Sequence, residues 1–264
     1  MIKSLEIDTI AKATKEFSIC TLVTNKQEYD EMIESFYKAG FSDKNSEFLY
    51  IDNSKNNKYD AYDGINLFLN NANGRYIILC HQDILLQFDD IVQLRKKIDE
   101  VNHIDPKWAI LANAGFQDFN NIALRMTDPL GTNRKIGHFP SKVLSIDENF
   151  IVVKREANLT LSSNVGGFHF YGTDLTFIAD ILGYNSYVID FHLFHKSGGN
   201  VNKNFYDNKK RFIEKYTKTL QWKIVRTPVT PLFISNFLLL NKLCNTKLCY
   251  SFKKRWDRLI EFIR

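Results

Sequence analysis

A short, unbroken apolar run in the first third of the chain constrains the fold most. Residues 77–80, Ile-Ile-Leu-Cys, form this run, which is typical of a strand buried on both faces in a parallel sheet. The run stops abruptly at the polar residues His81, Gln82 and Asp83. Every strand must end somewhere polar, but in open α/β sheets this edge is also where ligands bind. We therefore expect a central strand whose carboxyl end contributes to a binding site.

Strand-like and helix-like segments alternate around this run. Expected strands cover residues 17–23, 47–51, 77–80 and 108–114, and apolar residues recur at helical spacing over 29–36, 62–69 and 91–101. Asn25 with Glu28, and the pair Asp89 and Asp90, are residues that commonly begin such helices. This alternation predicts an α/β fold with right-handed crossovers and a mostly parallel central sheet covered by helices on both faces.

The pattern is less regular in the second half. Residues 115–142 are rich in Gly, Pro, Asn and Asp and predict either a long loop or a small irregular hairpin region. Residues 143–147 and 149–156 are expected to form a β-hairpin. A helix is predicted from Thr173, with its buried side formed by Leu175, Ile178, Ile181 and Leu182. A strand is then expected over 187–195, ending at His195.

Several polar side chains follow the expected strands directly. Thr24, Asp52 and Asp83 each stand at a strand end, where nucleotides bind in such layouts. The sequence contains neither a GxGxxG nor a GxxxxGK[ST] pattern, so a phosphate group would have to be held by a metal or by side chains. A carboxylate and an imidazole at one sheet edge could bind a hard or borderline divalent ion.

Composition limits the class of protein. With 264 residues the chain can form one large domain or two small ones. Its four cysteines show neither a CxxC pair nor a zinc-binding spacing, which fits a reducing cytoplasm. The charged N-terminal stretch has no apolar core typical of a secretory signal. Residues 218–264 carry ten Lys or Arg against two acidic residues, so the first 217 residues have a net charge of −3 within a total of +5.

The order of these segments resembles the nucleotide-sugar glycosyltransferases with the GT-A fold, within the family-two-like group that includes the streptomycin-biosynthesis type. The resemblance covers roughly residues 17–215 and rests on the strand ends at Thr24 and Asp52, the stretches 65–83 and 168–184, the hairpin around Asp147, and His195. It implies a catalytic domain over 1–217, with a nucleotide-binding half at about 17–114 and an acceptor half at about 143–217. Residues 218–264 would form a separate basic, amphipathic segment.

The resemblance also implies the residues of the site. Asp83 matches the last carboxylate of the family's Asp-x-Asp motif, which holds Mn²⁺ or Mg²⁺, and His81 stands in place of the first Asp. His195 matches a histidine that can complete the metal site. The implied nucleotide-sugar site comprises Thr24, Asn25, Asp52, Asn66, Arg75, His81 and Gln82.

The position of the catalytic base departs from the family pattern. Asp174 matches the second Asp of Glu-Asp-x-Asp-Leu, which leaves Gly172 at the usual base position and Tyr171 in place of Glu. Three alternatives follow: Asp174 acts as base, His169 does, or the reaction needs no such base. Each residue also has a structural explanation, because Asp174 could cap a helix and His169 could pack among the aromatic residues of 168–171. We assign Asp174 as base, with His169 as the second candidate.

The sequence thus predicts a cytoplasmic, metal-dependent glycosyltransferase, with a hexosyltransferase expected. It would transfer sugar from a nucleotide-diphosphate donor to a glycan or lipid-linked glycan of a surface polysaccharide or lipopolysaccharide. The rival hypothesis is a non-catalytic partner subunit that binds a nucleotide sugar or glycan; a third is a nucleotidyltransferase. The basic tail could lie at the anionic inner face of the cytoplasmic membrane or pack on its own domain. Nucleic acid is not an expected partner, because the tail lacks a stacking platform and the remainder is acidic.

Overall fold

The structure is a computed structural model that describes residues 13–198, 203–228, 230–246, 248, 249, 251 and 255. The chain divides into two compact units, Met1–Arg211 and Phe212–Arg264, each of which is described by itself. The helix α5 (Lys203–Thr219) contains the point of division.

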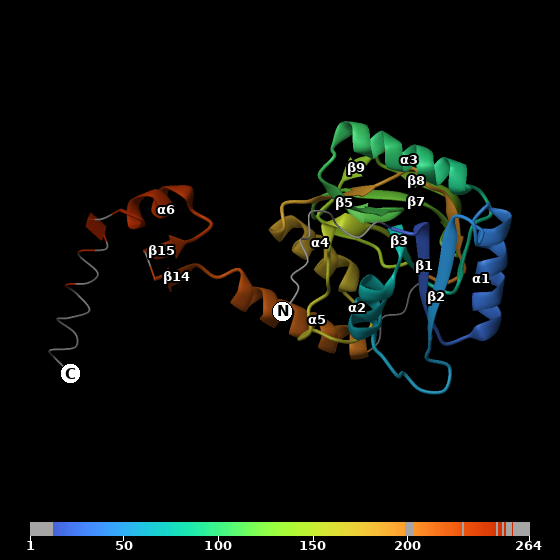
Figure 1. Cartoon of the computed structure of the whole chain (residues 1–264), viewed down its shortest axis with the longest axis horizontal. Helices are drawn as coiled ribbons and strands as arrows, with labels where there is room; N and C mark the ends of the chain where they lie inside the picture. The colour runs from blue at the N-terminus through green and yellow to red at the C-terminus, as the bar shows by residue number, and fades with distance from the viewer. Residues whose placement is uncertain are drawn as a thin grey trace, which may run out of the picture. The chain divides into compact units, whose positions relative to one another are not determined.

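The first unit is built around a seven-stranded mixed sheet (Figure 1), whose order is β2-β1-β3-β11-β5-β12-β9. The strands are β1 (Lys15–Val23), β2 (Ser46–Asp52), β3 (Gly74–Cys80), β5 (Trp108–Ala112), β9 (Ser141–Lys142), β11 (Phe150–Lys154) and β12 (Asn185–Val188). The pairs β1–β2, β1–β3 and β5–β12 are parallel, as the alternating pattern predicts. The sheet is mixed because β11 enters antiparallel between β3 and β5.

A second sheet of shorter strands continues from one edge of this core, with the order β10-β6-β7-β13-β4 and with β8 paired to β7. Its strands are β4 (Ile84–Leu85), β6 (Ala114–Phe116), β7 (Ile122–Asp128), β8 (Gly131–Ile136), β10 (Ser145–Ile146) and β13 (Leu193–His195). The antiparallel pair β7–β8 confirms the hairpin alternative for the irregular region. The predicted strand 108–114 bends at the buried Asn113 and so serves both sheets.

The helices begin at residues that suit helix starts. Asn25, Asp60 and Asp90 accept backbone amide hydrogen bonds at the first turns of α1 (Lys26–Lys38), α2 (Ala61–Asn71) and α3 (Ile91–Ile104), which satisfies amides that have no partner within the helix. The apolar stripes of α1 and α3 join one core cluster with alternate residues of β1 and β3. The helix α2 packs closely on β1 at Gly64, where a Cβ would lie 2.6 Å from Leu22.

The predicted hairpin of 143–147 with 149–156 is wrong. The two strands join different sheets: β10 pairs with β6, whereas β11 lies between β3 and β5 in the centre of the large sheet. All five residues of β11 are buried, and a strand that is apolar on both faces is stabilised only where both faces are covered. The short connection that remains, Asp147–Asn149, lies at the carboxyl end of β3, where the His81 amide donates to the Asn149 carbonyl (3.0 Å).

The predicted strand 187–195 is two strands. β12 ends at Val188 and belongs to the large sheet, while β13 begins at Leu193 and pairs with β7 and β4 in the second sheet. Between them Asp190 pairs with Arg125 and Lys135. His192 Nε2 lies 2.9 Å from the Thr127 hydroxyl, a hydrogen bond that gives it a structural role. Because β13 pairs with β4, which directly follows β3 in the chain, His195 lies near the carboxyl end of β3.

The helix predicted from Thr173 begins two residues earlier, as α4 (Tyr171–Ile181). Leu175 and Ala179 form its buried side, and Tyr171 is buried at its first turn. The predicted apolar face was wrong at its end, because Ile181 and Leu182 are 59% and 52% exposed. A helix of this length needs only one covered stripe, and these two residues stand at its carboxyl end.

The second unit contains the end of α5, an antiparallel pair formed by β14 (Lys223–Arg226) and β15 (Pro231–Ile234), and α6 (Leu238–Cys244). Residues 232–240, within the expected amphipathic segment 218–264, are therefore part strand and part helix. Many apolar side chains of the second unit are exposed, among them Trp222, Ile224, Phe237, Leu238, Leu239 and Leu243. Lys253, Lys254, Trp256 and Arg258, on which the amphipathic prediction also depends, lie outside the described residues.

Candidate metal and nucleotide site

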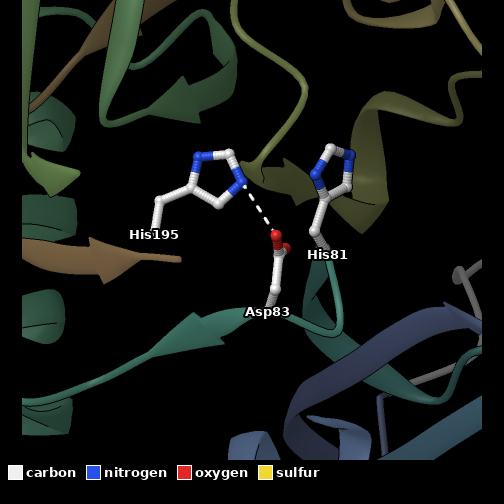
Figure 2. A group of neighbouring side chains, drawn as sticks. All are labelled: His81, Asp83 and His195. Atoms are coloured by element: carbon white, nitrogen blue, oxygen red, sulfur yellow. Dashed lines mark ion pairs between the residues drawn. The ribbon is translucent and has the colours of Figure 1, made fainter. Parts of the chain in front are cut away.

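Three potential metal ligands meet at the carboxyl end of β3. His81, Asp83 and His195 each offer a ligand atom, and these atoms all lie within 4.8 Å of one another. Figure 2 shows the three side chains pointing toward a common centre, with an ion pair between His195 Nε2 and Asp83 Oδ2 at 3.4 Å. The antiparallel pairing of His195 with Ile84 in β4 places the two distant segments together, and the Lys196 amide donates to the Asp83 carbonyl (3.1 Å).

A chain of hydrogen bonds sets the orientation of the His81 ring. The Tyr171 hydroxyl donates to the Glu148 carbonyl oxygen (3.1 Å), so its own oxygen is left to accept from His81 Nε2, which lies 2.9 Å away. With its proton on Nε2, the neutral imidazole carries a lone pair on Nδ1. Figure 2 shows one ring nitrogen of His81 on the side of Asp83 and the other pointing away. His81 is thus prepared to act as a ligand.

The charges of the cluster also suit a cation. Burial works to raise the pKa of Asp83, but its hydrogen bonds with His195 and Ser197 outweigh this effect and hold the pKa below its ordinary value. Burial lowers the pKa of His81 and so favours the neutral ring, which is the form that binds metals. The cluster therefore combines a carboxylate with a neutral imidazole at one sheet edge.

The donor set fits a divalent ion. Ligand atoms about 2.2 Å from one ion lie up to roughly 4.5 Å apart, close to the separations found here. Two imidazoles and one carboxylate suit Mn²⁺ better than Mg²⁺, which prefers oxygen ligands. The hydrogen bond from Tyr171 to the far side of His81 is the kind of outer support that metal-binding histidines commonly have.

Gln82 joins the neighbouring strand end to this site. Its side-chain oxygen accepts from the amides of Thr24 (2.8 Å) and Asn25 (2.9 Å). Its side-chain nitrogen donates to the Thr24 hydroxyl and to Glu28. The structure thus brings Thr24, Asn25 and Gln82 together with His81 and Asp83, which are adjacent to Gln82 in the chain. Asn25 also begins α1, so part of its role is structural.

The other predicted nucleotide-site residues either lie away from this cluster or have side chains that already hydrogen-bond to other parts of the fold. Asp52 ends β2, and its carboxylate accepts from the amide and hydroxyl of Ser54. Asn66 lies on α2, where its side chain bonds the backbone of Leu161 in both directions and the Thr160 hydroxyl. Arg75 stands at the start of β3, and six residues of strand place it roughly 20 Å from His81. The structure does not bring Arg75 to the site.

Neither predicted base is arranged for proton transfer. Asp174 is fully buried, and its carboxylate accepts from the Ser162 amide and hydroxyl, both at 2.8 Å. Those bonds tie the segment before α4 to the helix, which is a structural role. His169 packs edge-on against Phe205 (5.3 Å between ring centres), and burial lowers its pKa. The helix cap expected for Asp174 is not seen, because its carboxylate binds Ser162 instead. His169 packs against an aromatic ring as expected, although that ring is Phe205.

Comparison with known proteins places the chain in a family. It is 34% identical over 223 residues to the protein named ATP synthase subunits region ORF 6 from Fuscovulum blasticum, covering 81% of this chain and 88% of that protein. The chain belongs to the ORF 6 family. No family model matches the chain.

Solved structures identify the fold of this ORF 6 family member. GalNAc-T7, crystallised with UDP, GalNAc and Mn²⁺, superposes with a TM-score of 0.50 at 9% identity, over 76% of this chain and 48% of that one. TarS residues 1–349 from S. aureus in complex with UDP-GlcNAc gives 0.49 at 13% identity, over 73% and 64%. The chain spans less than two thirds of either structure. The GT-A fold predicted from the sequence is confirmed.

Two residues of this site were not assigned from the sequence. Tyr171 was noted only as a substitution in the base motif, yet it holds His81. Glu148 was considered only as part of a hairpin turn, yet its carboxylate accepts from the amide of Gly172 at the start of α4 (3.2 Å). The available signal was that Tyr171 and Gly172 differ from the base motif of the resembling family. The residue that contacts both of them, Glu148, could be found only once the position of the loop 147–149 was known.

Proposed function

We propose that this ORF 6 family protein is a metal-dependent glycosyltransferase that uses a nucleotide-diphosphate sugar. The observation that carries the proposal is the cluster of His81, Asp83 and His195, with His81 Nδ1 oriented as a ligand, at the carboxyl edge of a GT-A sheet. In open α/β sheets this edge is where ligands bind, and the diphosphate of such a donor needs a cation.

Each residue of the site has a defined task in this proposal. His81, Asp83 and His195 would hold the ion, and Tyr171 keeps His81 in the required tautomer. When bound, a divalent ion supplies positive charge against the diphosphate that departs. Gln82 fixes the loop after β1 through the amides of Thr24 and Asn25, and so shapes the wall against which the nucleoside would lie.

Finer features of the proposal rest on the resemblance. They are a hexose as the transferred sugar, Mn²⁺ ahead of Mg²⁺, membership of the streptomycin-type group, and a surface polysaccharide or lipopolysaccharide as the acceptor. A division at residue 217 between the catalytic domain and the basic tail is part of the same proposal.

A lipid-linked acceptor would be reached through the second unit. Its exposed Trp222, Phe237 and Leu238 accompany the strongly basic composition of residues 218–264, and such a combination favours binding at an anionic bilayer surface on the cytoplasmic side. None of the helices seen in the described part of the chain has the length and apolar character needed to cross a bilayer. We expect the protein to co-sediment with vesicles that contain anionic lipid and not with neutral vesicles; equal partition would contradict the proposal.

A donor panel tests the function. Purified protein is incubated with UDP-, GDP-, CMP- and dTDP-sugars, with Mn²⁺, Mg²⁺ or EDTA, and released nucleotide is measured. We expect release from one donor class, stimulated by Mn²⁺ and abolished by EDTA. Pyrophosphate release from a nucleoside triphosphate would instead indicate a nucleotidyltransferase.

The rival function is a non-catalytic subunit that binds a nucleotide sugar or a glycan. The observation that favours it is that both Asp174 and His169 are committed to structural contacts. Saturable donor binding by calorimetry, without nucleotide release under any metal condition, would support this function over the enzyme.

A further inference from the structure

Glu148 lies on the loop 147–149, whose backbone contacts the metal ligand His81, and is not itself part of the metal cluster. It lies in the connection between β10 and β11, and its Oε1 accepts the Gly172 amide (3.2 Å) while its backbone carbonyl accepts the Tyr171 hydroxyl (3.1 Å). The same Tyr171 hydroxyl contacts His81. Tyr171 therefore links the Glu148 backbone to a metal ligand, while the Glu148 carboxylate lies at the start of the same helix. Glu148 is only partly buried.

Gly172 is what allows this placement. A Cβ at position 172 would lie 3.1 Å from Glu148 Cγ and 3.0 Å from the Ile146 carbonyl, so a larger residue would push the loop and the carboxylate away. The φ of Gly172 is not among the positive values found in this chain. The requirement for glycine is thus one of space around Glu148 and not of backbone conformation.

A purely structural role for Glu148 has to be weighed against a chemical one. The N-cap residue of α4, Phe170, provides no side-chain hydrogen bond to the helix, and a carboxylate that accepts an amide at this end compensates for it. Such a cap needs only a hydrogen-bond acceptor, which a glutamine also provides. The environment of Glu148 gives it a property that a cap does not need.

That property is a strongly altered affinity for protons. Burial is the main cause that raises the pKa of Glu148 to about 8; the Asp147 charge on the same loop adds to it, and the hydrogen bond from the Gly172 amide opposes it. On α4, Tyr171, whose pKa is raised by burial, contacts the backbone carbonyl of Glu148 and, at the end of β3, the ring of His81. A base whose pKa lies near the working pH transfers protons most effectively.

We propose that Glu148 is the general base of this site, which accepts the proton of the acceptor hydroxyl. This inference rests on the proposed glycosyltransferase function. It adds the residue that removes the proton from the attacking hydroxyl of the sugar acceptor. In a single displacement, the hydroxyl oxygen forms a bond to the anomeric carbon as the bond from that carbon to the donor phosphate oxygen breaks. The bonding pair leaves with the nucleoside diphosphate, and the hydroxyl proton passes to the Glu148 carboxylate.

The test is Glu148→Gln, which keeps the acceptor for the Gly172 amide and removes the base. Its matched control is Glu156→Gln, an exposed glutamate beyond the opposite end of β11. With the donor found in the panel and Mn²⁺, we expect Glu148→Gln to lose about 10²–10⁴-fold in turnover. Binding of Mn²⁺ and UDP should be unchanged in both variants, and Glu156→Gln should turn over normally.

Two further measurements separate a base from a cap. Wild-type turnover should rise with pH through about 8, because the base acts when deprotonated, and Glu148→Gln should lack this limb. Asp147→Asn should move the limb to lower pH, since it removes a charge that raises the pKa of Glu148. A helix cap would produce neither change.

Stability provides a readout that needs no substrate. Because the folded-state pKa of Glu148 lies above its ordinary value, the stability that comes from the protonated form is lost as the pH rises through about 8. Glutamine cannot ionise, so the variant does not lose this stability. The melting temperature of Glu148→Gln minus that of wild type should therefore become larger from about pH 5 to about pH 9.

The outcomes distinguish this inference from the function on which it rests. An active wild type with a Glu148→Gln variant of equal turnover and equal pH profile would overturn the inference alone. A wild type that neither binds nor turns over any donor would overturn the proposed function, and the role of Glu148 with it. Loss of turnover with retained UDP and Mn²⁺ binding supports both.

Discussion

Replacing Asp83 by Asn is expected to abolish sugar transfer while the fold remains intact. The amide is neutral and is a weak metal ligand, so His81 and His195 would be left without the one anion of the cluster. Charge stabilisation by a metal contributes several kcal/mol to such a reaction, which corresponds to a loss of about 10²–10⁴-fold in turnover. Nucleotide release and Mn²⁺ binding by calorimetry measure the effect, and circular dichroism checks the fold.

Two companion variants sharpen this prediction. Tyr171→Phe removes only the hydroxyl that supports His81, and loss of such outer support typically weakens metal binding by about 10–100-fold. Asp180→Asn, at an exposed carboxylate on α4, is the matched control and should behave as wild type. Near-normal turnover and Mn²⁺ affinity in Asp83→Asn would remove the basis for a metal at this position.

Replacing Asp174 by Ala is expected to reduce stability strongly, whatever its effect on turnover. The substitution leaves the buried Ser162 amide and hydroxyl without the carboxylate that accepts from them. Hydrogen bonds to a charged group contribute about 1.5–3 kcal/mol each, so we expect a loss of about 3 kcal/mol or more in the free energy of unfolding. For a unit of this size that corresponds to a fall of about 6–12 °C in melting temperature.

A double-mutant cycle attributes this loss to the contact itself. Ser162→Ala removes the hydroxyl donor alone, and the two substitutions together should cost less than the sum of the single changes. The cycle also decides between the two explanations of Asp174. A variant that keeps its melting temperature but loses turnover would restore Asp174 as the base, in place of Glu148.

Local features of the sequence were enough to predict much of the framework. Asn25 and Asp90 accept amide hydrogen bonds at the starts of α1 and α3, because capping involves residues only two or three positions apart. The apolar run 77–80 is fully buried in the central sheet. Its polar end carries Asp83 and His81, and both take part in the cluster.

Contacts between distant segments set features that the sequence does not show. The strand β11 was placed in a hairpin because the sequence shows its neighbours along the chain and not its partners β3 and β5. Asp174 was assigned as base from its position in a motif, whereas its environment is set by Ser162 on a separate segment. In both cases burial decided the outcome, and burial depends on how the elements pack.

The chain alone therefore determines where α1 and α3 begin, which strand is central, and that this strand is followed by an imidazole and a carboxylate. The packed structure decides which groups meet there: His195 through the pairing of β13 with β4, and Tyr171 and Glu148 through the docking of α4 on the loop 147–149. The physical reason is that propensity and capping act over a few residues. The tautomer of a histidine and the pKa of a carboxylate are set instead by neighbours that only tertiary packing supplies.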